Sequence, residues 1–281
     1  MKKGLVLLAS AALVAGSLTA SAVSAKKVLQ VKGSDTLVHL SSAWAENFMK
    51  KHPNVEVAVT GGGSGTGIAA LLNGTADLAN ASRKIKDKEV KLAGEKGMDI
   101  KEHVVALDGI GVIVNPDNPI DALSMEQLKD IFTGKVTNWK KAGGPNKGIV
   151  LFTRDSSSGT FAFFQKRVLK KEDYAVKSRR LPSNSAIVQS VADDKYAIGY
   201  VGLGYVAEAG DKIKALAVKV GDKKGVKPTQ KTVAAGDYPI SRGLQIYSNG
   251  EPKGDAKTFM DYIMSDAGQD VVSEMGFVPV K

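Results

Sequence analysis

The chain has 281 residues, of which 43% are hydrophobic and 24% are charged, and its formal net charge is +10. These values are typical of a globular protein and exclude a disordered or fibrous chain. The chain contains no cysteine, which excludes disulfides, thiolate metal sites, cysteine nucleophiles and the attachment point of a lipoprotein anchor. The positive charge favours encounters with anions, although dispersed lysines are equally typical of an ordinary solvated surface.

The first residues are typical of a secretory signal peptide. Lys2 and Lys3 precede an apolar run over residues 5–15, and Val23-Ser24-Ala25 supplies the small residues that a signal peptidase recognises. Polar and small residues from Gly16 onward interrupt this run before it reaches the ~18 apolar residues that a membrane anchor requires. We therefore expect cleavage after Ala25 and export to the periplasm.

Strand and helix signals alternate along the rest of the chain, which predicts an α/β fold. The expected strands are residues 28–32, 55–59, 104–114, 148–152, 198–201 and 244–248. No long linker divides the chain into sequential domains. If the protein has two domains, the best candidates for strands that pass between them are residues 106–114 and 239–247.

Helices are expected where apolar residues recur at helical spacing between clear stop signals. The expected helices are 37–48, which ends before His52-Pro53, 68–72, a helix from the capping box Ser124/Gln127 to about Gly134, one beginning near Phe161, and one amphipathic helix over 256–275.

Three turns share one design, in which a predicted strand ends and a helix begins within a run of small polar residues. They are Gly33-Ser34-Asp35-Thr36, the glycine-rich run 61–67 and the segment 153–160. A helix N-terminus carries unpaired N–H groups and a partial positive charge, so it suits an oxyanion. Glycine allows close backbone approach, and serine and threonine hydroxyls add donors. Ligands of open α/β sheets also bind at the carboxyl ends of strands.

Two arginines accompany these turns. Arg154, in the third turn, offers a charge-assisted contact to a phosphate-like group. A fourth segment, 79–83, follows a short strand-like run at 77–79 and contributes Ser82 and Arg83. Arg83 is interpreted equally well as a surface arginine beside a helix cap. Any single turn of this kind is most often a plain N-cap, so it is the repetition of the design that predicts an anion site.

Other site chemistries fit the sequence less well. The glycine-rich run lacks the Gly-Lys-Ser/Thr of a P-loop, and no Gly-x-Ser-x-Gly elbow surrounds Ser64 or Ser158. The three histidines, His39, His52 and His103, are widely separated and show no metal-ligand spacing. An exported phosphoester hydrolase is therefore the weaker alternative. The sequence has no basic helix of the kind that would indicate nucleic-acid binding.

At these turns the sequence resembles the periplasmic phosphate-binding proteins of the PstS family, which serve an ATP-driven phosphate importer. The most specific segment is Arg154–Thr160, which resembles the family's arginine loop, while Gly63–Gly67 resembles its second anion loop. The resemblance extends over essentially the whole mature chain. It implies the two-lobed fold of type II periplasmic binding proteins with two crossover strands, in which residues 26–110 and 240–281 form lobe 1 and residues 111–239 form lobe 2.

The resemblance also implies a set of phosphate-binding residues. They are Thr36, the amide of Leu37, Ser64, Ser82, Arg83, Arg154, Ser158, Gly159 and Thr160. Many family members have an aspartate at the position of Ser82, where it accepts the proton of hydrogen phosphate and repels sulfate. Asp35 and Asp155 are alternative acceptors in this chain, and both equally suit a capping or arginine-orienting role. The family's aspartate two residues after the arginine is replaced by Ser156.

The resemblance thus implies high-affinity capture of inorganic phosphate in an interlobe cleft and delivery to the membrane permease of an ABC-type importer. We expect a monomer that is not an enzyme and that has no cofactor, metal or nucleic-acid partner. A binding protein for another oxyanion, such as sulfate or molybdate, remains the alternative, because an uncharged serine rejects sulfate less strongly than an aspartate does.

Overall fold

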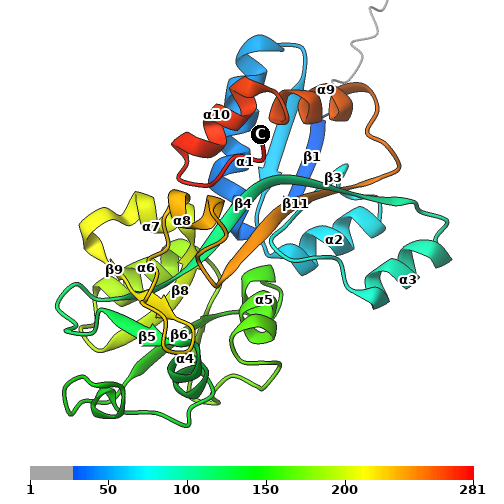
Figure 1. Ribbon diagram of the computed structural model, residues 1–281. Helices are drawn as coiled ribbons and strands as arrows, with labels where there is room; N and C mark the ends of the chain where they lie inside the picture. Colours follow the sequence, from blue (N-terminus) through cyan, green and yellow to red (C-terminus); the bar gives the residue numbers. More distant parts are fainter. Residues whose placement is uncertain (1–27) are drawn as a thin grey trace, which may run out of the picture.

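The computed structural model describes residues 28–281, so the predicted signal peptide and its cleavage point after Ala25 lie outside the described residues. Two lobes are connected by a pair of long strands, β4 (Ile100–Val114) and β11 (Ser241–Asn249) (Figure 1). These strands contain most of the two segments predicted to cross between domains. The α/β fold with two crossover strands is therefore confirmed. Across the described chain no helix combines the length and apolar character needed to span a membrane.

Lobe 1 is built from both ends of the described chain. Figure 1 shows the N-terminal segments in blue beside the C-terminal segments in red. Its strands are β1 (Val28–Gly33), β2 (Glu56–Thr60) and β3 (Leu78–Ala81). Its helices are α1 (Val38–Lys51), α2 (Ser64–Leu72), α3 (Asp87–Glu95), α9 (Gly254–Ile263) and α10 (Asp266–Glu274), and a 3-10 turn covers Asp35–Leu37.

Lobe 2 comes from the middle of the chain. Its strands are β5 (Ala122–Ser124), β6 (Val150–Arg154), β7 (Arg179–Leu181), β8 (Ala197–Gly202), β9 (Lys214–Ala215) and β10 (Ala217–Lys219). Its helices are α4 (Met125–Phe132), α5 (Gly159–Arg167), α6 (Asn184–Ala192), α7 (Leu203–Ala209) and α8 (Gln230–Ala234), with 3-10 turns at Trp139–Ala142 and Gly210–Lys212.

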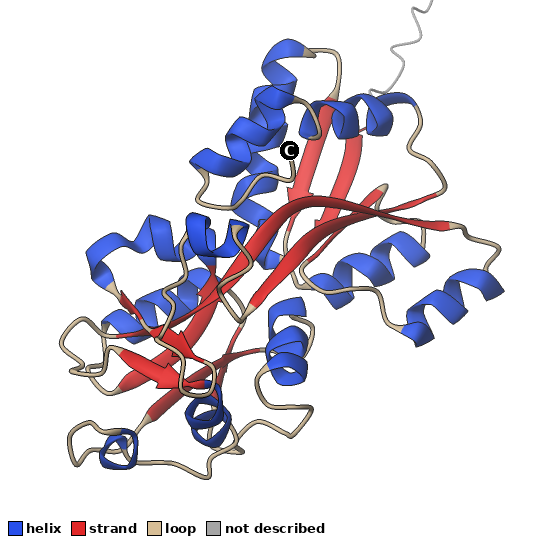
Figure 2. Ribbon diagram, in the orientation of Figure 1, coloured by secondary structure: helices blue, strands red, loops and turns tan. Residues whose placement is uncertain are grey.

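One curled sheet runs through both lobes (Figure 2). Its strand order is β2-β1-β3-β11-β4-β8-β6-β7, and β9 also pairs with β4. Strand β1 is parallel to β2 and β3, and β6 is parallel to β7 and β8. Strand β4 pairs antiparallel with β11 over residues 100–109 and with β8 over residues 110–114. A single strand thus belongs to the sheets of both lobes.

Helices cover both faces of the sheet in each lobe because successive strand residues point to opposite sides. In β4, Val112 and Val114 pack into one lobe 2 cluster with Phe132, while Ile113 packs into another with Ile187. In lobe 1, Trp44 of α1 is fully buried beneath α9 and α10. Its indole N–H donates to the carbonyl of residue 268 at 2.7 Å. Both lobes therefore have rigid cores that fix the loops at their strand ends.

The C-terminal prediction of one helix over 256–275 is wrong, because the structure has two helices there. Helix α9 ends at Ile263, and Ser265 begins α10 by accepting a hydrogen bond from the N–H of Gly268 at 3.2 Å. A Cβ at Gly268 would lie 2.1 Å from the carbonyl oxygen of Tyr262, so the second helix folds closely over the end of the first. The apolar periodicity continues through this break, which is why it predicted a single helix.

The other predicted elements are confirmed, with shifted bounds where small polar residues begin a helix. Helix α2 begins at Ser64 and not at residue 68, and α5 begins at Gly159 and not near Phe161. The capping box of α4 forms as predicted, with reciprocal bonds between Ser124 and Gln127. Apolar periodicity cannot detect a first turn of Gly, Ser and Thr, and these turns are the ones that face the other lobe.

Candidate functional site

The carboxyl ends of four strands meet where the two lobes face each other. In lobe 1, β1 ends at Gly33, β2 at Thr60 and β3 at Ala81. Because these strands are parallel, the loops that follow them lie side by side at one edge of the sheet. In lobe 2, β6 ends at Arg154, and the loop after it lies against the loops of lobe 1.

Three serine hydroxyls of lobe 1 form a continuous hydrogen-bonded chain. Ser34 Oγ donates to Ser82 Oγ at 2.8 Å, and Ser82 Oγ lies 3.3 Å from Ser64 Oγ. The backbone N–H of Ser82 also donates to Ser64 Oγ at 3.0 Å. All three residues are buried. Because a hydroxyl both donates and accepts, each of them can turn its hydrogen toward an anion without moving its oxygen.

Lobe 2 presents the first turn of α5 to these hydroxyls. A Cβ at Gly159 would lie 2.2 Å from Ser64 Oγ and 2.6 Å from Ser82 Oγ, so only glycine permits this close approach. The amides of Gly159 and Thr160 open the helix and have no acceptor within it. Ser158 caps the helix by accepting from the amide three residues later, which leaves its hydroxyl hydrogen available to donate.

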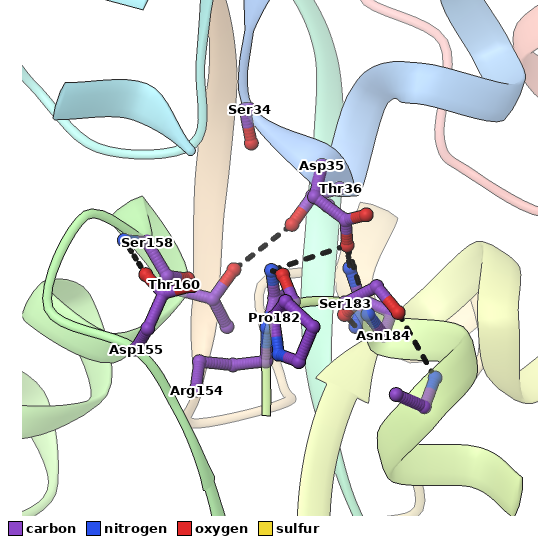
Figure 3. Close-up of polar contacts among 12 residues, drawn as sticks. Ser34, Asp35, Thr36, Arg154, Asp155, Ser158, Thr160, Pro182, Ser183 and Asn184 are labelled. Carbon is purple, nitrogen blue, oxygen red and sulfur yellow. Dashed lines mark hydrogen bonds and ion pairs between the residues drawn. The ribbon is translucent and has the colours of Figure 1, made fainter. Parts of the chain in front are cut away.

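Direct contacts between the lobes surround this point. Thr36 Oγ1 of lobe 1 lies 2.9 Å from Thr160 Oγ1 of lobe 2 (Figure 3). At the rim, the Gly65 N–H donates to the Ser157 carbonyl at 3.0 Å, and Ser157 Oγ donates to the Gly62 carbonyl at 2.9 Å. The structure is therefore a closed form of a two-lobed protein.

Arg154 is the charged group with unused donors at this site. Its side chain is 1% exposed, its Nη2 donates to the Pro182 carbonyl at 2.7 Å, and the same atom lies 3.2 Å from Oδ2 of Asp35 (Figure 3). Nε and Nη1 are buried without a hydrogen-bond partner. A guanidinium can only donate, and leaving charged donors buried and unpaired is costly. These two nitrogens therefore suit an anionic acceptor.

The two aspartates beside the site are engaged in protein contacts. Asp35 Oδ2 accepts from the Asn184 N–H at 2.8 Å as well as pairing with Arg154. Asp155 Oδ1 accepts from the N–H groups of Ser157 at 2.9 Å and Ser158 at 3.1 Å. These contacts are of the arginine-orienting and loop-capping kinds. The site is consequently rich in donors and poor in uncommitted carboxylates.

In the described chain no histidine contacts Ser64 or Ser158. The histidines have other partners: His39 with Glu208, His52 with Phe48 and His103 with Ser248. A serine nucleophile needs a base within hydrogen-bond reach. The geometry therefore favours binding over the phosphoester hydrolysis that the sequence left as an alternative.

Comparison with known proteins gives the family. A family model described as a PBP superfamily domain matches residues 20–267. The phosphate-binding protein PstS of Bacillus subtilis is 38% identical over 256 residues, covering 90% of this chain and 80% of its own. PstS of Staphylococcus saprophyticus is 36% identical, with coverage of 88% and 78%. The chain belongs to the PstS family.

Solved structures agree with this family membership. A phosphate ABC transporter substrate-binding protein from Clostridium perfringens, solved with bound phosphate, has a TM-score of 0.82 and 33% identity, covering 91% of this chain and 100% of its own. An ABC-type phosphate transport receptor from Vibrio cholerae has a TM-score of 0.71 and 29% identity, with coverage of 89% and 99%. The predicted PstS-family membership and type II fold class are confirmed.

Most of the residues that the PstS resemblance implied lie together where the lobes meet. They are Thr36, Ser64, Ser82, Arg154, Ser158, Gly159 and Thr160. The other two have different contacts. The Leu37 amide donates to the Ser34 carbonyl at 3.1 Å within its own turn. Arg83 directs its terminal amino groups to Glu89 at 2.8 and 2.7 Å, and although burial opposes ionisation, these bonds hold the pKa of Glu89 below its ordinary value.

Sequence reasoning missed three residues of this PstS-family site. Ser34 was part of a highlighted turn but was not singled out, although its hydroxyl begins the serine chain. Arg242 and Asp108 form a buried pair behind the two threonines, with Nη2 2.7 Å from Oδ2. Arg242 is the only charged residue of β11, and Asp108 is the only one in residues 104–114 of β4, so a charge within an apolar crossover segment could have identified both.

Proposed function

We propose that this PstS-family protein binds inorganic phosphate between its lobes and delivers it to the permease of an ABC-type importer. The observation that carries the proposal is Arg154, a buried guanidinium whose Nε and Nη1 have no partner and which lies among hydroxyls from both lobes. The B. subtilis relative is named a phosphate-binding protein, and the C. perfringens structure holds phosphate. Both support phosphate as the anion.

In this proposal, fixed donors replace the water around the anion. Ser34, Ser64 and Ser82 donate from lobe 1, and the first turn of α5 donates its amides from lobe 2. Arg154 supplies the positive charge, held in place by Asp35. We propose Thr36, Ser158 and Thr160 as further donors, and we assign Arg83 and the Leu37 amide to structural roles.

Closure of the lobes connects binding to transport. The ligand groups come from both lobes, so the anion stabilises the form in which Ser157 contacts Gly62 and Gly65. The permease would then recognise the surface that exists only when the lobes are closed.

We further propose export with cleavage after Ala25, action as a monomer, and lobe limits at residues 26–110 with 240–281 and at residues 111–239.

Titration calorimetry with phosphate tests the proposal. The mature protein should bind phosphate with one site, and Arg154→Ala should lose at least ~100-fold in affinity, because a hydrogen bond to a charged group contributes about 1.5–3 kcal/mol and the variant loses two. Arg167→Ala is the matched control, because Arg167 is an exposed arginine at the far end of α5 and its side chain donates to the Pro239 carbonyl. Unchanged affinity in the Arg154 variant would contradict the assignment.

Sulfate is the second candidate, because Asp35 and Asp155 accept from protein donors and Ser82 carries no charge. A site whose nearby carboxylates are engaged by the protein has little to repel an anion that carries no proton. Competition between sulfate and phosphate for the wild-type protein separates the two. Sulfate binding as tight as phosphate binding would make general oxyanion capture the better description.

A further inference from the structure

Asp35 lies where the first turn of lobe 1 rests on lobe 2. Its side chain is 16% exposed, and it begins the 3-10 turn Asp35–Leu37 that follows β1. Asn184, which is fully buried, begins α6 of lobe 2 next to it (Figure 3). This contact includes neither the serine chain nor the first turn of α5, so it is a separate connection between the lobes.

Donors of lobe 2 converge on Asp35. The backbone N–H and the side-chain Nδ2 of Asn184 both donate to Asp35 Oδ2, the backbone N–H at 2.8 Å. Arg154 Nη2 lies 3.2 Å from the same oxygen. The hydroxyl of Tyr205 in α7 donates to the backbone carbonyl of Asp35 at 2.8 Å. One residue of lobe 1 is therefore held by three residues of lobe 2.

The contact between Asp35 and Asn184 is a helix cap supplied by the other lobe. Asn184 is the first residue of α6, so its N–H has no acceptor within that helix. A carboxylate beside a helix N-terminus is also stabilised by the helix dipole. Asn184 Oδ1 accepts from the Gly202 N–H at 3.2 Å, which holds the side-chain amide with Nδ2 toward Asp35. Residues of lobe 2 alone therefore fix the position of Asn184.

The neighbours of these residues connect the contact to closure of the lobes. Asp35 and Thr36 are consecutive in one turn, and Arg154 and Thr160 belong to the single segment that joins β6 to α5. A movement that withdraws Thr36 from Thr160 therefore also withdraws Asp35 from Arg154. The bonds between Asp35 and Asn184 join protein groups only, so they favour the closed form whether or not an anion is bound.

We propose that Asp35 is a positioning residue that latches lobe 1 onto lobe 2 through Asn184 and Tyr205, so that part of the affinity for phosphate comes from contacts between protein groups. This inference rests on the proposed function. A ligand that requires the closed form binds more weakly when only a small fraction of the molecules is closed without it. The contacts of Asp35 raise that fraction, because they form part of the closed arrangement in advance.

Spin labels on the two lobes measure the closed fraction. The chain has no cysteine, so Lys91→Cys in α3 and Lys166→Cys in α5 give one exposed labelling site on each lobe. Electron–electron double resonance then gives the distance between the labels without phosphate and at increasing phosphate concentrations. Without phosphate, this labelled background should already contain a closed fraction, and saturating phosphate should increase it.

Variants of the contact should change both closure and affinity. Asn184→Asp places a second carboxylate against Asp35, so it should remove most of the closed fraction seen without phosphate. It should also lower phosphate affinity about 10- to 100-fold, as expected when a hydrogen bond to a charged group is lost. Asp35→Asn/Asn184→Asp exchanges amide and carboxylate between the lobes at constant charge and should recover most of both. Tyr205→Phe should lower the affinity about 2- to 10-fold.

Asn138→Asp is the matched control, because Asn138 caps a 3-10 turn within lobe 2 by accepting from the Lys140 N–H and should change neither quantity. Thermal melts and circular dichroism select the folded variants. If Asn184→Asp does not fold, the double variant and Tyr205→Phe still test the contact.

Wild-type protein that fails to bind phosphate would defeat the proposed function, whereas the closed fraction without phosphate would still test the role of Asp35. That role is overturned if the labelled background has no closed fraction without phosphate, or if the folded variants match it in closure and affinity. It is also overturned if Asp35→Asn/Asn184→Asp recovers nothing that Asn184→Asp has lost.

Discussion

Arg154 is the last residue of β6 and Arg83 lies two residues after β3, so both are at the carboxyl ends of buried strands, but they differ in what their donors contact. Both side chains are at most 7% exposed, and each is paired with a carboxylate. Both terminal amino groups of Arg83 bond Glu89. Arg154 leaves Nε and Nη1 without a partner. The position of an arginine at the end of a strand therefore indicates only that it is near a site, whereas buried donors without a partner indicate that it can bind a ligand.

The difference between the two arginines is tested most directly by replacing each of them with methionine. Arg154→Met should lower phosphate affinity by ~100-fold or more, because two charge-assisted bonds are lost. Arg83→Met should change it by less than about fivefold, yet should lower the free energy of unfolding by about 1–3 kcal/mol, because Glu89 is left partly buried without its partner. Calorimetry and chemical denaturation measure the two quantities. Equal losses of affinity would place Arg83 in the ligand shell.

The segment after Arg154 also differs from the one around Arg83 in its close contact with the other lobe, which Gly159 makes with Ser64. Gly159→Ala should weaken phosphate binding about tenfold or more, since its Cβ would fall 2.2 Å from Ser64 Oγ and overpacking typically costs ~1–3 kcal/mol. Gly148→Ala is the matched control, because a Cβ there meets no atom within 4 Å. Isothermal titration of both variants checks the expectation. Tight binding by Gly159→Ala would mean that closure does not depend on this approach.

The smallest expected effect concerns Glu89 and acid stability. Its folded-state pKa is lowered, so its contribution to stability is present above its ordinary pKa of 4.5 and is lost as pH falls through the lower folded value. The melting-temperature advantage of wild type over Glu89→Gln should therefore shrink between about pH 7 and about pH 3. Phosphate affinity near neutral pH should stay within about twofold. A constant advantage across this interval would contradict the charged pairing of Arg83 and Glu89.

Much of the fold could be predicted because strand and helix periodicities are local. The apolar run of β4 and the capping box of α4 were both visible in the sequence. The break between α9 and α10 was not, since Ser265 and Gly268 act through a close packing contact that periodicity does not encode. The candidate anion-binding residues in the loops at the strand ends were likewise predicted, because runs of Gly, Ser and Thr between a strand and a helix are local patterns.

The part of the site that escaped prediction depends on long-range register. Arg242 and Asp108 are far apart in sequence, and only the pairing of β11 with β4 brings them together beneath Thr160. Family resemblance did not supply them either, because it was carried by the turns. The ion pair between Arg83 and Glu89 could not be predicted from the sequence either. Glu89 is one of several charged residues in α3, and the pattern of charges does not show which of them is buried against an arginine.

The assignment of both chain ends to lobe 1 constrains the order of folding. Strand β3 reaches the rest of the sheet through β11, which pairs residues 79–81 with residues 245–247, and α1 packs against α10. Lobe 2 consists of one continuous stretch and can condense as soon as that stretch is available. Lobe 1 must wait for its last two helices, so its early strands remain an unfinished edge during synthesis. The half of the molecule made first is therefore completed last.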